Sequence, residues 1–339
     1  MWHNTLGRTG LRVSALGLGS NRLRFYDRGV AEIVWNYALD RGISFFETGR
    51  MYDDGQTEEW IGQAIGHRRG EYVLASKCGA RLSADEARRD LERSLTALRT
   101  DHLDAYRLAP IDSPAALVEA LRPGGPQDGL DRARDEGLIG ATGLTGHNHE
   151  VLIQAMETGR FDTVLFVAHM GLYNDLVRRL LATAQRLAVG TMIMRPLGHH
   201  VLRPNPALRL ALASGADTVL CGMYSPQEMD ENLALAQEAP SAAERAALLA
   251  EARELSSGCL RCGGDIRTVP CACPHGIDVR HIMEIGPFRA RHGLIAYGEQ
   301  EWSTAAEAAR RCDDCGQCER GCVAHLSIIP SIHAAVATR

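Results

Sequence analysis

The stretch SFFETGRMYDDG, from Ser44 to Gly55, decides the fold of this chain. Its start continues an apolar run from Ile43 that is typical of a strand buried on both faces. The chain then turns polar between Glu47 and Tyr52, before a helical pattern begins at Thr57. In a barrel of alternating strands and helices, side chains just beyond the C-terminal end of a strand face the catalytic mouth. We therefore expect Glu47 and Tyr52 to be neighbours in an active site; the alternative is a buried strand followed by a polar turn.

Strand-like runs and helical patterns alternate along residues 1–240. The helical stretches include Val30 to Asp40 and Asp85 to Leu98, where apolar residues recur with a period of about 3.6. Eight such strand-helix units predict an α/β fold, a (β/α)8 TIM barrel, after a short hairpin that ends near Leu11. The runner-up, a doubly wound open sheet, needs G-x-G-x-x-G after its first strand, and the sequence lacks it. The predicted strands end near Gly19, Thr48, Lys77, Ala109, Gly143, His169, Leu197 and Met223.

The composition excludes several classes of partner. The chain has 339 residues, a formal net charge of −5 and a sequence pI of about 6.2, so it carries no field that would hold nucleic acid. Neither a signal-peptide pattern nor an uncharged apolar run of about 18 residues occurs. We therefore expect a cytoplasmic protein that binds a small-molecule substrate and no membrane.

Cysteines gather near the C-terminus. Eight of the ten have close spacings that favour metal ligation over disulfides in a chain without a secretory signal. The last four form C-x2-C-x2-C-x3-C, which is typical of a [4Fe-4S] cluster, and the first four suit a second cluster, with zinc as the competing interpretation. Cys78 and Cys221 are expected to be small buried hydrophobes. The eight candidate ligands are Cys259, Cys262, Cys271, Cys273, Cys312, Cys315, Cys318 and Cys322.

Ordered motifs along residues 1–240 resemble the aldo/keto reductase superfamily. They are LGRTGLRVSALGLG, GISFFETGRMYDDGQTEEWIGQAIG, LASKCG, LDAYRLAP, IGATGLTGH, MIMRPLG and CGMYSPQEMDENL. GLTGH, MRPLG and the cysteine-rich end are similar to one branch, whose members carry a C-terminal ferredoxin-like iron-sulfur domain. The resemblance implies a barrel in residues 1–240, followed in residues 241–339 by a spacer helix and a small helical iron-sulfur domain.

The resemblance also implies a catalytic set. Family members use an Asp, a Tyr, a Lys and a His, in which Tyr transfers the proton and Lys lowers the Tyr pKa. Tyr52 and Lys77 match, Glu47 stands at the Asp position, and Ala109 stands where the His should be. Because Ala offers no hydrogen bond, another side chain is needed or the reaction differs. The histidines expected just after strands are His147, His169, His199 and His200.

Cofactor residues follow from the same resemblance. The family binds NADPH or NADH, and both remain open here, because Glu228 stands where relatives that prefer NADP carry a basic residue. If ferredoxin topology holds, Cys273 joins the cluster of the last C-x2-C-x2-C run, and Cys322 joins the cluster of Cys259, Cys262 and Cys271. The residues implied for the nicotinamide cofactor are Thr145, Arg195, Gly222, Ser225, Glu231 and Asn232.

Three functions are compatible with these motifs. The first is an aldo/keto reductase-type oxidoreductase with a nicotinamide at the barrel mouth and iron-sulfur clusters that relay electrons, so an electron-transfer partner is possible. The second is a redox-neutral lyase, dehydratase or isomerase in which Tyr52 and Lys77 do acid-base work. The third is a redox sensor or scaffold without turnover, which the retention of Tyr52 and Lys77 disfavours.

Overall fold

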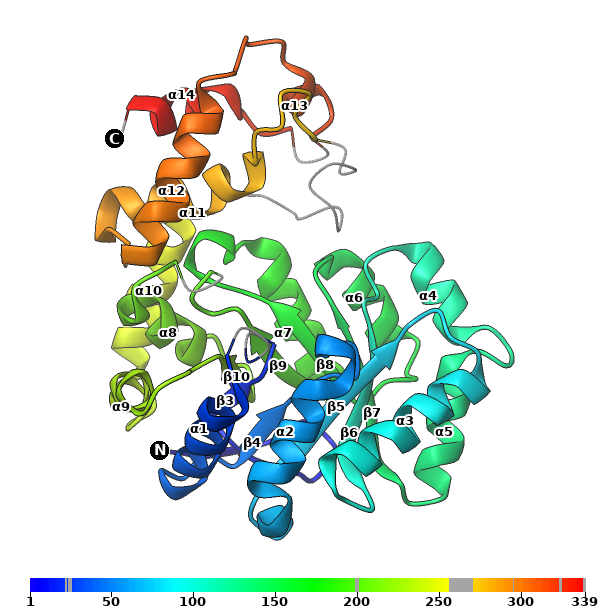
Figure 1. Ribbon diagram of the computed structural model, residues 1–339. Helices are drawn as coiled ribbons and strands as arrows, with labels where there is room; N and C mark the ends of the chain where they lie inside the picture. Colours follow the sequence, from blue (N-terminus) through cyan, green and yellow to red (C-terminus); the bar gives the residue numbers. More distant parts are fainter. Residues whose placement is uncertain are drawn as a thin grey trace.

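Eight parallel strands of the described residues close into a barrel, in the order β10-β3-β4-β5-β6-β7-β8-β9 (Figure 1). The computed structural model describes residues 1–21, 23, 26–198, 201–255, 271–294, 296–322 and 325–337. The barrel strands are β3 (Leu16–Gly19), β4 (Phe45–Glu47), β5 (Val73–Gly79), β6 (Leu103–Ala109), β7 (Ile139–Gly146), β8 (Thr163–Val167), β9 (Gly190–Met194) and β10 (Thr218–Cys221). Around them lie α1 (Arg28–Asp40), α2 (Gln56–Ile65), α3 (Ala84–Leu98), α4 (Pro114–Leu121), α5 (Pro126–Asp135), α6 (His149–Glu157), α7 (Asp175–Leu187), α8 (Pro204–Ala213) and α9 (Pro226–Leu235), with the short turns η2 (Tyr52–Gly55), η3 (Gly66–Glu71) and η4 (Met170–Leu172).

This architecture confirms the predicted α/β barrel and its opening hairpin. In the hairpin, β1 (His3–Thr5) pairs antiparallel with β2 (Arg12–Ser14), so its second strand lies beyond the expected end at Leu11. The strand end predicted at Gly143 is wrong, because β7 continues to Gly146 and pairs there with Phe166 of β8. Glycine inside this strand reflects close packing, since a Cβ at Gly143 would lie 2.1 Å from the hydroxyl oxygen of Thr163.

The barrel interior has an apolar layer below a charged one. Because side chains alternate between the two faces of a strand, residues two positions apart lie on the same face, and both point into the barrel when one of them does. Glu47, Lys77 and Arg107 each lie two residues beyond a member of the apolar layer, toward the C-terminal end of the barrel. The apolar layer consists of Phe45, Ala75, Ala105, Ala141, Leu165, Met192 and Leu220, with Leu6 and Val13 from the hairpin below it.

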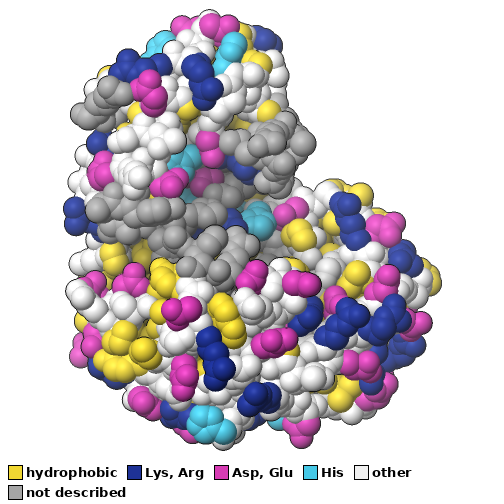
Figure 2. Space-filling view, viewed as in Figure 1, with side chains coloured by type: hydrophobic (Ala, Val, Ile, Leu, Met, Phe, Trp, Pro, Cys, Tyr) yellow, Lys and Arg dark blue, Asp and Glu magenta, His cyan; other side chains and the backbone are white. Residues whose placement is uncertain are grey.

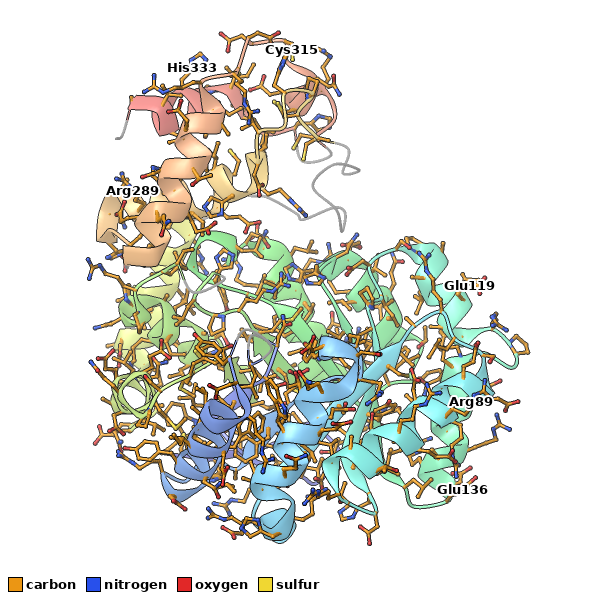
Figure 3. All side chains as sticks on the ribbon, viewed as in Figure 1. Arg89, Glu119, Glu136, Arg289, Cys315 and His333 are labelled. Atoms are coloured by element: carbon orange, nitrogen blue, oxygen red, sulfur yellow. The ribbon has the colours of Figure 1, made fainter. Side chains whose placement is uncertain are left out.

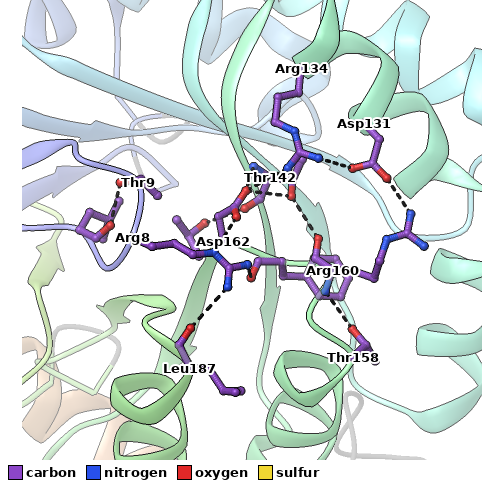
Figure 4. A network of polar contacts seen from close by, with 12 residues as sticks. Arg8, Thr9, Asp131, Arg134, Thr142, Thr158, Arg160, Asp162 and Leu187 are labelled. Carbon is purple, nitrogen blue, oxygen red and sulfur yellow. Dashed lines mark hydrogen bonds and ion pairs between the residues drawn. The ribbon is translucent and has the colours of Figure 1, made fainter.

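A polar network closes the N-terminal end of the barrel (Figure 4). Asp162 accepts hydrogen bonds from Arg8 Nε at 3.0 Å, from Arg134 Nη1 at 3.2 Å and from the backbone N–H of Thr142 at 3.1 Å. The network ties the hairpin loop to α5 and β7. Ion pairs this close to solvent contribute at most about 1 kcal/mol each, and this end of a barrel serves stability rather than chemistry.

The helices that follow residue 255 gather beyond the C-terminal ends of the barrel strands (Figure 1). α10 (Ala242–Leu255) confirms the helix predicted from Ser241, but it packs on α8, where Arg209 Nη2 lies 2.6 Å from Glu244 Oε2. It is therefore part of the barrel surface and not a free spacer. We call the helices that follow the C-terminal helices; they are α11 (Val279–His292), α12 (Ala296–Ala309), α13 (Gln317–Arg320) and α14 (Ile329–Ala337).

The C-terminal helices contact the loop that follows β8. The Nε2 of His169 lies 3.1 Å from the Oε2 of Glu284 in α11, and both side chains are buried. Gly171 allows this approach, because a Cβ there would lie 1.8 Å from the carbonyl oxygen of Glu284. The loop after β8 is therefore packed directly against α11.

The face of the molecule drawn in Figure 2 shows no field of one sign. Acidic and basic side chains are interspersed over the face drawn in Figure 2, as the small net charge of −5 suggests. Among the described residues, no helix combines the length and the apolar character needed to cross a lipid bilayer.

Candidate active site

A cavity of about 280 Å³ opens among the C-terminal ends of the barrel strands. Glu47, Tyr52 and Lys77, which the sequence predicts as catalytic residues, all line it, and so does Ala109. These residues come from β4, the following turn, β5 and β6, so the barrel brings together positions far apart in the chain. Active sites of such barrels form at this C-terminal face.

The turn that carries Tyr52 is fixed by an ion pair between the buried Glu58 and the half-buried Arg50. Arg50 Nη1 lies 3.3 Å from Glu58 Oε2, and Arg50 Nη2 donates to the carbonyl oxygen of Asp54 at 3.1 Å. Gly55 has a φ of +90°, and a Cβ there would lie 1.8 Å from the Arg50 guanidinium. Burial raises the pKa of Glu58, although hydrogen bonds from Ser76 and Arg50 oppose that shift. The glycine and the ion pair together hold Tyr52 against the barrel mouth.

Lys77 lies between the two other predicted catalytic residues. Its ammonium donates to the carboxylate of Glu47 and, at 2.9 Å, to the carbonyl oxygen of Thr48. The same Nζ lies 4.1 Å from the centroid of the Tyr52 ring. Burial lowers the pKa of Lys77 to about 8; attraction by Glu47 opposes this shift, and repulsion by Arg107 adds to it. A cation beside the Tyr52 ring stabilises a phenolate there.

Arg107 is a charged neighbour that the sequence reasoning missed. Its side chain is fully buried, and its Nη2 lies 3.0 Å from the Oε1 of Glu47. Arg107 pairs in register with Lys77 on the adjacent strand, so both side chains reach the same carboxylate from neighbouring strands. The signal was present in LDAYRLA, because an arginine in the middle of a strand buried on both faces must have a partner.

His147 borders the cavity near Ala109. It follows β7, and its Nδ1 lies 3.0 Å from the Oδ2 of Asp112, in the loop after β6. Burial raises the pKa of Asp112, but hydrogen bonds from His147 and from the backbone N–H of Asn148 outweigh it and lower that pKa overall. Asp112 is therefore a carboxylate that orients the His147 ring, and pairing through Nδ1 leaves Nε2 as the nitrogen that can reach a ligand.

The other candidate histidines have different outcomes. His169, one of the four histidines predicted at or after strand ends, contacts Glu284 of α11 and does not line the cavity. His199 and His200 lie outside the described residues. Cys78 and Cys221 are both buried, as predicted, and burial raises the pKa of both thiols, to about 12 for Cys221.

The residues implied for a nicotinamide fall into two groups. Thr145, Arg195 and Gly222 line the cavity, and the Oγ1 of Thr145 is buried without a hydrogen-bond partner among the described residues. The Oδ1 of Asn232 in α9 is likewise buried without a partner in the described part of the chain. Buried acceptors of this kind suit a bound molecule that has amide or amino N–H groups.

The second group lies at the start of α9. Ser225 caps this helix, and its Oγ accepts from the backbone N–H of Glu228 at 3.2 Å. Glu228 in turn accepts at 2.7 Å from the backbone N–H of Tyr224, which lines the cavity. Glu231 is exposed one turn later and bonds Gln227 at 3.1 Å. A carboxylate at Glu228 makes this helix start a poor site for a second phosphate.

Six of the eight candidate metal ligands lie in the described residues, and Cys259 and Cys262 lie outside them. Burial raises the pKa of Cys312 and Cys318, and for both thiols the nearby Cys273 adds to that rise. The chain fold therefore brings Cys273 to the C-x2-C-x2-C run. Cys315, labelled with His333 in Figure 3, is exposed in that run, while Cys271 and Cys322 are buried.

Comparison with known proteins points in one direction. The profile described as "Aldo/keto reductase family" matches residues 15–206. L-galactose dehydrogenase from Arabidopsis thaliana is 29% identical over 214 residues, which cover 58% of this chain and 66% of the plant protein, just under two thirds. The uncharacterized oxidoreductase YrpG from Bacillus subtilis is 33% identical over 242 residues, which cover 62% of this chain and 72% of that protein.

A solved structure resembles the same part of the chain. The holo form of an aldo-keto reductase from Bacillus halodurans superimposes with a TM-score of 0.64 at 20% identity. The superposition covers 76% of this chain and 97% of that chain, and at this identity it concerns the fold alone.

Proposed function

Because the chain belongs to the aldo/keto reductase family, we propose that it is a nicotinamide-dependent oxidoreductase that interconverts a small alcohol and its carbonyl product. The observation that carries this proposal is the position of Lys77, in contact with Glu47 and 4.1 Å from the Tyr52 ring centroid, in the wall of a cavity. Such a lysine lowers the Tyr52 pKa, so that Tyr52 can exchange a proton with a substrate oxygen near neutral pH.

Three residues implied for a nicotinamide cofactor, Thr145, Arg195 and Gly222, line the cavity, and three more belong to α9 and its cap. When bound, the nicotinamide supplies or accepts a hydride. We assign the buried acceptors Thr145 Oγ1 and Asn232 Oδ1 to N–H groups of this cofactor, and Arg195, Gly222, Ser225 and Glu231 to its remaining contacts. Glu228 would repel a 2′-phosphate, which favours NADH over NADPH.

His147 supplies the hydrogen bond that Ala109 cannot make. Asp112 fixes its ring, and its Nε2 is the atom that can contact the substrate oxygen. In the proposed mechanism Tyr52 exchanges a proton with the substrate oxygen, and His147 orients that oxygen. Lys77, held by Glu47, lowers the Tyr52 pKa. A donor in such a place contributes about 10²–10³ in rate.

The substrate class is small and polar. A cavity of about 280 Å³ is at or below the lower end of ordinary ligand pockets, which span roughly 300–1,000 Å³. The plant relative is named for the oxidation of a sugar, which supports a hydroxylated substrate for this chain.

Titration of the purified protein with NADH and NADPH tests this function. We expect nicotinamide fluorescence to change on binding, with NADH bound more tightly than NADPH, because Glu228 disfavours the added phosphate. Glu228→Lys is the diagnostic variant and should invert that preference, while the exposed Glu136→Lys should leave it unchanged. Absence of binding of either nucleotide would contradict the proposal and favour redox-neutral chemistry at Tyr52.

We also propose that, within residues 241–339, the part that follows α10 forms a ferredoxin-like unit with two [4Fe-4S] clusters. The approach of Cys273 to Cys312 and Cys318 supports one ligand set, completed by the exposed Cys315. The second set would consist of Cys259, Cys262, Cys271 and Cys322. Clusters supply one-electron transfer, so they would connect the site to an electron-transfer partner.

Metal analysis after anaerobic purification tests the clusters. About eight irons and a similar amount of acid-labile sulfide per chain are expected. Joint replacement of Cys312 and Cys318 by Ala should remove about half of the iron, whereas Cys78→Ala, at a buried thiol far from the cysteine run in sequence, should remove none. Zinc without sulfide would overturn the cluster assignment.

A further inference from the structure

Three charged side chains meet beside the cavity, and their charges do not cancel. The carboxylate of Glu47 faces both the ammonium of Lys77 and the guanidinium of Arg107. Each of the three side chains is at most 5% exposed. One negative and two positive charges leave an excess positive charge in a dry site, where an uncompensated charge is costly.

Arg107 carries the part of this excess that cannot be lost. Burial lowers the pKa of Arg107, yet a guanidinium keeps its proton in proteins. Its Nε is buried without a hydrogen-bond partner among the described residues, and its Nη1 reaches only the sulfur of Met192, at 3.4 Å. Gly143 gives it room, since a Cβ there would lie 2.9 Å from the Arg107 Cγ. A side chain that leaves a donor unsatisfied is poorly explained as filler, because an apolar residue would fill the space at lower cost.

Tyr52 is the group whose ionisation can balance the excess. Lys77 Nζ lies 4.1 Å from its ring centroid, and the charge of Arg107 also interacts with Tyr52. Lys77 competes, because losing its own proton would remove one positive charge. Its ammonium, however, donates to Glu47 and to the carbonyl oxygen of Thr48, and both bonds favour its charged form.

The other ionisable groups around Tyr52 do not replace this balance. His147 is paired with Asp112, and Glu58 of α2 is paired with Arg50. Arg195 adds positive charge to the cavity wall, and the Cys221 thiol, whose pKa burial raises to about 12, stays neutral. Among the described residues, the remaining ionisable groups on the cavity wall or on the Tyr52 turn are Tyr224, Asp53 and Asp54, and the two aspartates are exposed to solvent.

We propose that Arg107 is a positioning residue that, together with Lys77, holds Tyr52 as a phenolate near neutral pH and so adapts the site to oxidise an alcohol. This inference rests on the proposed function and adds the favoured direction of the reaction, which is oxidation of the alcohol. In the reaction, the substrate hydroxyl proton passes to the Tyr52 oxygen. An oxidised nicotinamide, when bound, would accept the hydride of the C–H bond as the carbonyl forms. Tyr52 then releases the proton to solvent.

Ultraviolet titration of tyrosine in the nucleotide-free protein tests the proposal. Of the eight tyrosines, one should ionise below about pH 8, at least two units below the ordinary value of about 10. This early step should be absent in Tyr52→Phe. It should move up by at least one unit in Arg107→Met and return toward the wild-type value in Arg107→Lys, which keeps the charge. Circular dichroism of each variant checks that it has folded.

The pH dependence of alcohol oxidation gives a second measurement. The acid limb of kcat/KM should follow the tyrosine titration and shift to higher pH by the same amount in Arg107→Met. Identical tyrosine titrations in the wild-type protein and a folded Arg107→Met variant, or no early tyrosine at all, would overturn the inference. A tyrosine that titrates as expected in a protein that binds no nicotinamide would instead refute the proposed function while the charge assignment stands.

Discussion

Replacing Tyr52 with Phe is expected to lower kcat/KM by about 10²–10⁴-fold, because it removes the only proposed group that exchanges a proton with the substrate oxygen. The ring itself remains, so its packing against the Lys77 ammonium, 4.1 Å from the ring centroid, is preserved. Nicotinamide affinity should therefore stay within about two-fold of the wild-type value, which is much less than the tenfold change that about 1.4 kcal/mol of binding free energy would give. Steady-state kinetics with the best alcohol found in a substrate screen, together with nucleotide titration, make the measurement.

A histidine series separates proton transfer from orientation of the oxygen. His147→Ala should lose about 10²–10³-fold, as expected for one hydrogen-bond donor, and Asp112→Asn should lose less, because it misorients the ring without removing it. His67→Ala, at an exposed histidine on η3, is the matched control and should retain full activity. Unchanged turnover in Tyr52→Phe would remove the proposed mechanism, whatever the histidine variants do.

Replacing Glu47 with Gln is expected to lower the free energy of unfolding by about 3–5 kcal/mol. The variant leaves two buried cations, Lys77 and Arg107, without the one carboxylate that both contact. Equilibrium unfolding in urea at constant pH makes the measurement. The loss should shrink as the pH rises toward about 8, because Glu47 raises the pKa of Lys77; without that carboxylate, Lys77 releases its proton at lower pH and one of the two unpaired charges disappears.

Two further variants show whether the loss is electrostatic. Adding Arg107→Met to Glu47→Gln should recover part of the lost stability, because only Lys77 then remains unpaired. Glu71→Gln is the surface control: Glu71 Oε2 lies 2.8 Å from Arg68 Nη2, but its side chain is 53% exposed. Such a pair is worth about 1 kcal/mol or less. A Glu47→Gln variant no less stable than Glu71→Gln would mean that the barrel interior is far more hydrated than the burial of Glu47 indicates.

Much of the barrel could be predicted from the sequence because its signals are local. Apolar strands followed by polar turns and 3.6-period helices are visible residue by residue, and the turn at Glu47 and Tyr52 is the clearest of them. The continuation of β7 beyond Gly143 could not be predicted. A glycine is needed at this position because Thr163 on the adjacent strand leaves no room for a side chain.

The sequence indicated part of the candidate site through the family resemblance. Tyr52 and Lys77 matched motif positions of that family, and both line the cavity. Arg107 was missed because its role depends on its contact with Glu47, a residue of another strand. His147 and His169 could not be told apart, because a position at a strand end does not fix the direction of the imidazole ring. The partner of each histidine, Asp112 or Glu284, is a matter of tertiary structure.

The contact between His169 and Glu284 joins residues 115 positions apart, and this separation bears on the order of synthesis. The strand β8 and its loop leave the ribosome long before α11, and chains fold from the N-terminal part first as they are made. Until α11 is available, the backbone at Gly171 faces water instead of the carbonyl oxygen of Glu284. The loop after β8 is thus covered late in translation, after all the described residues that line the cavity have been made.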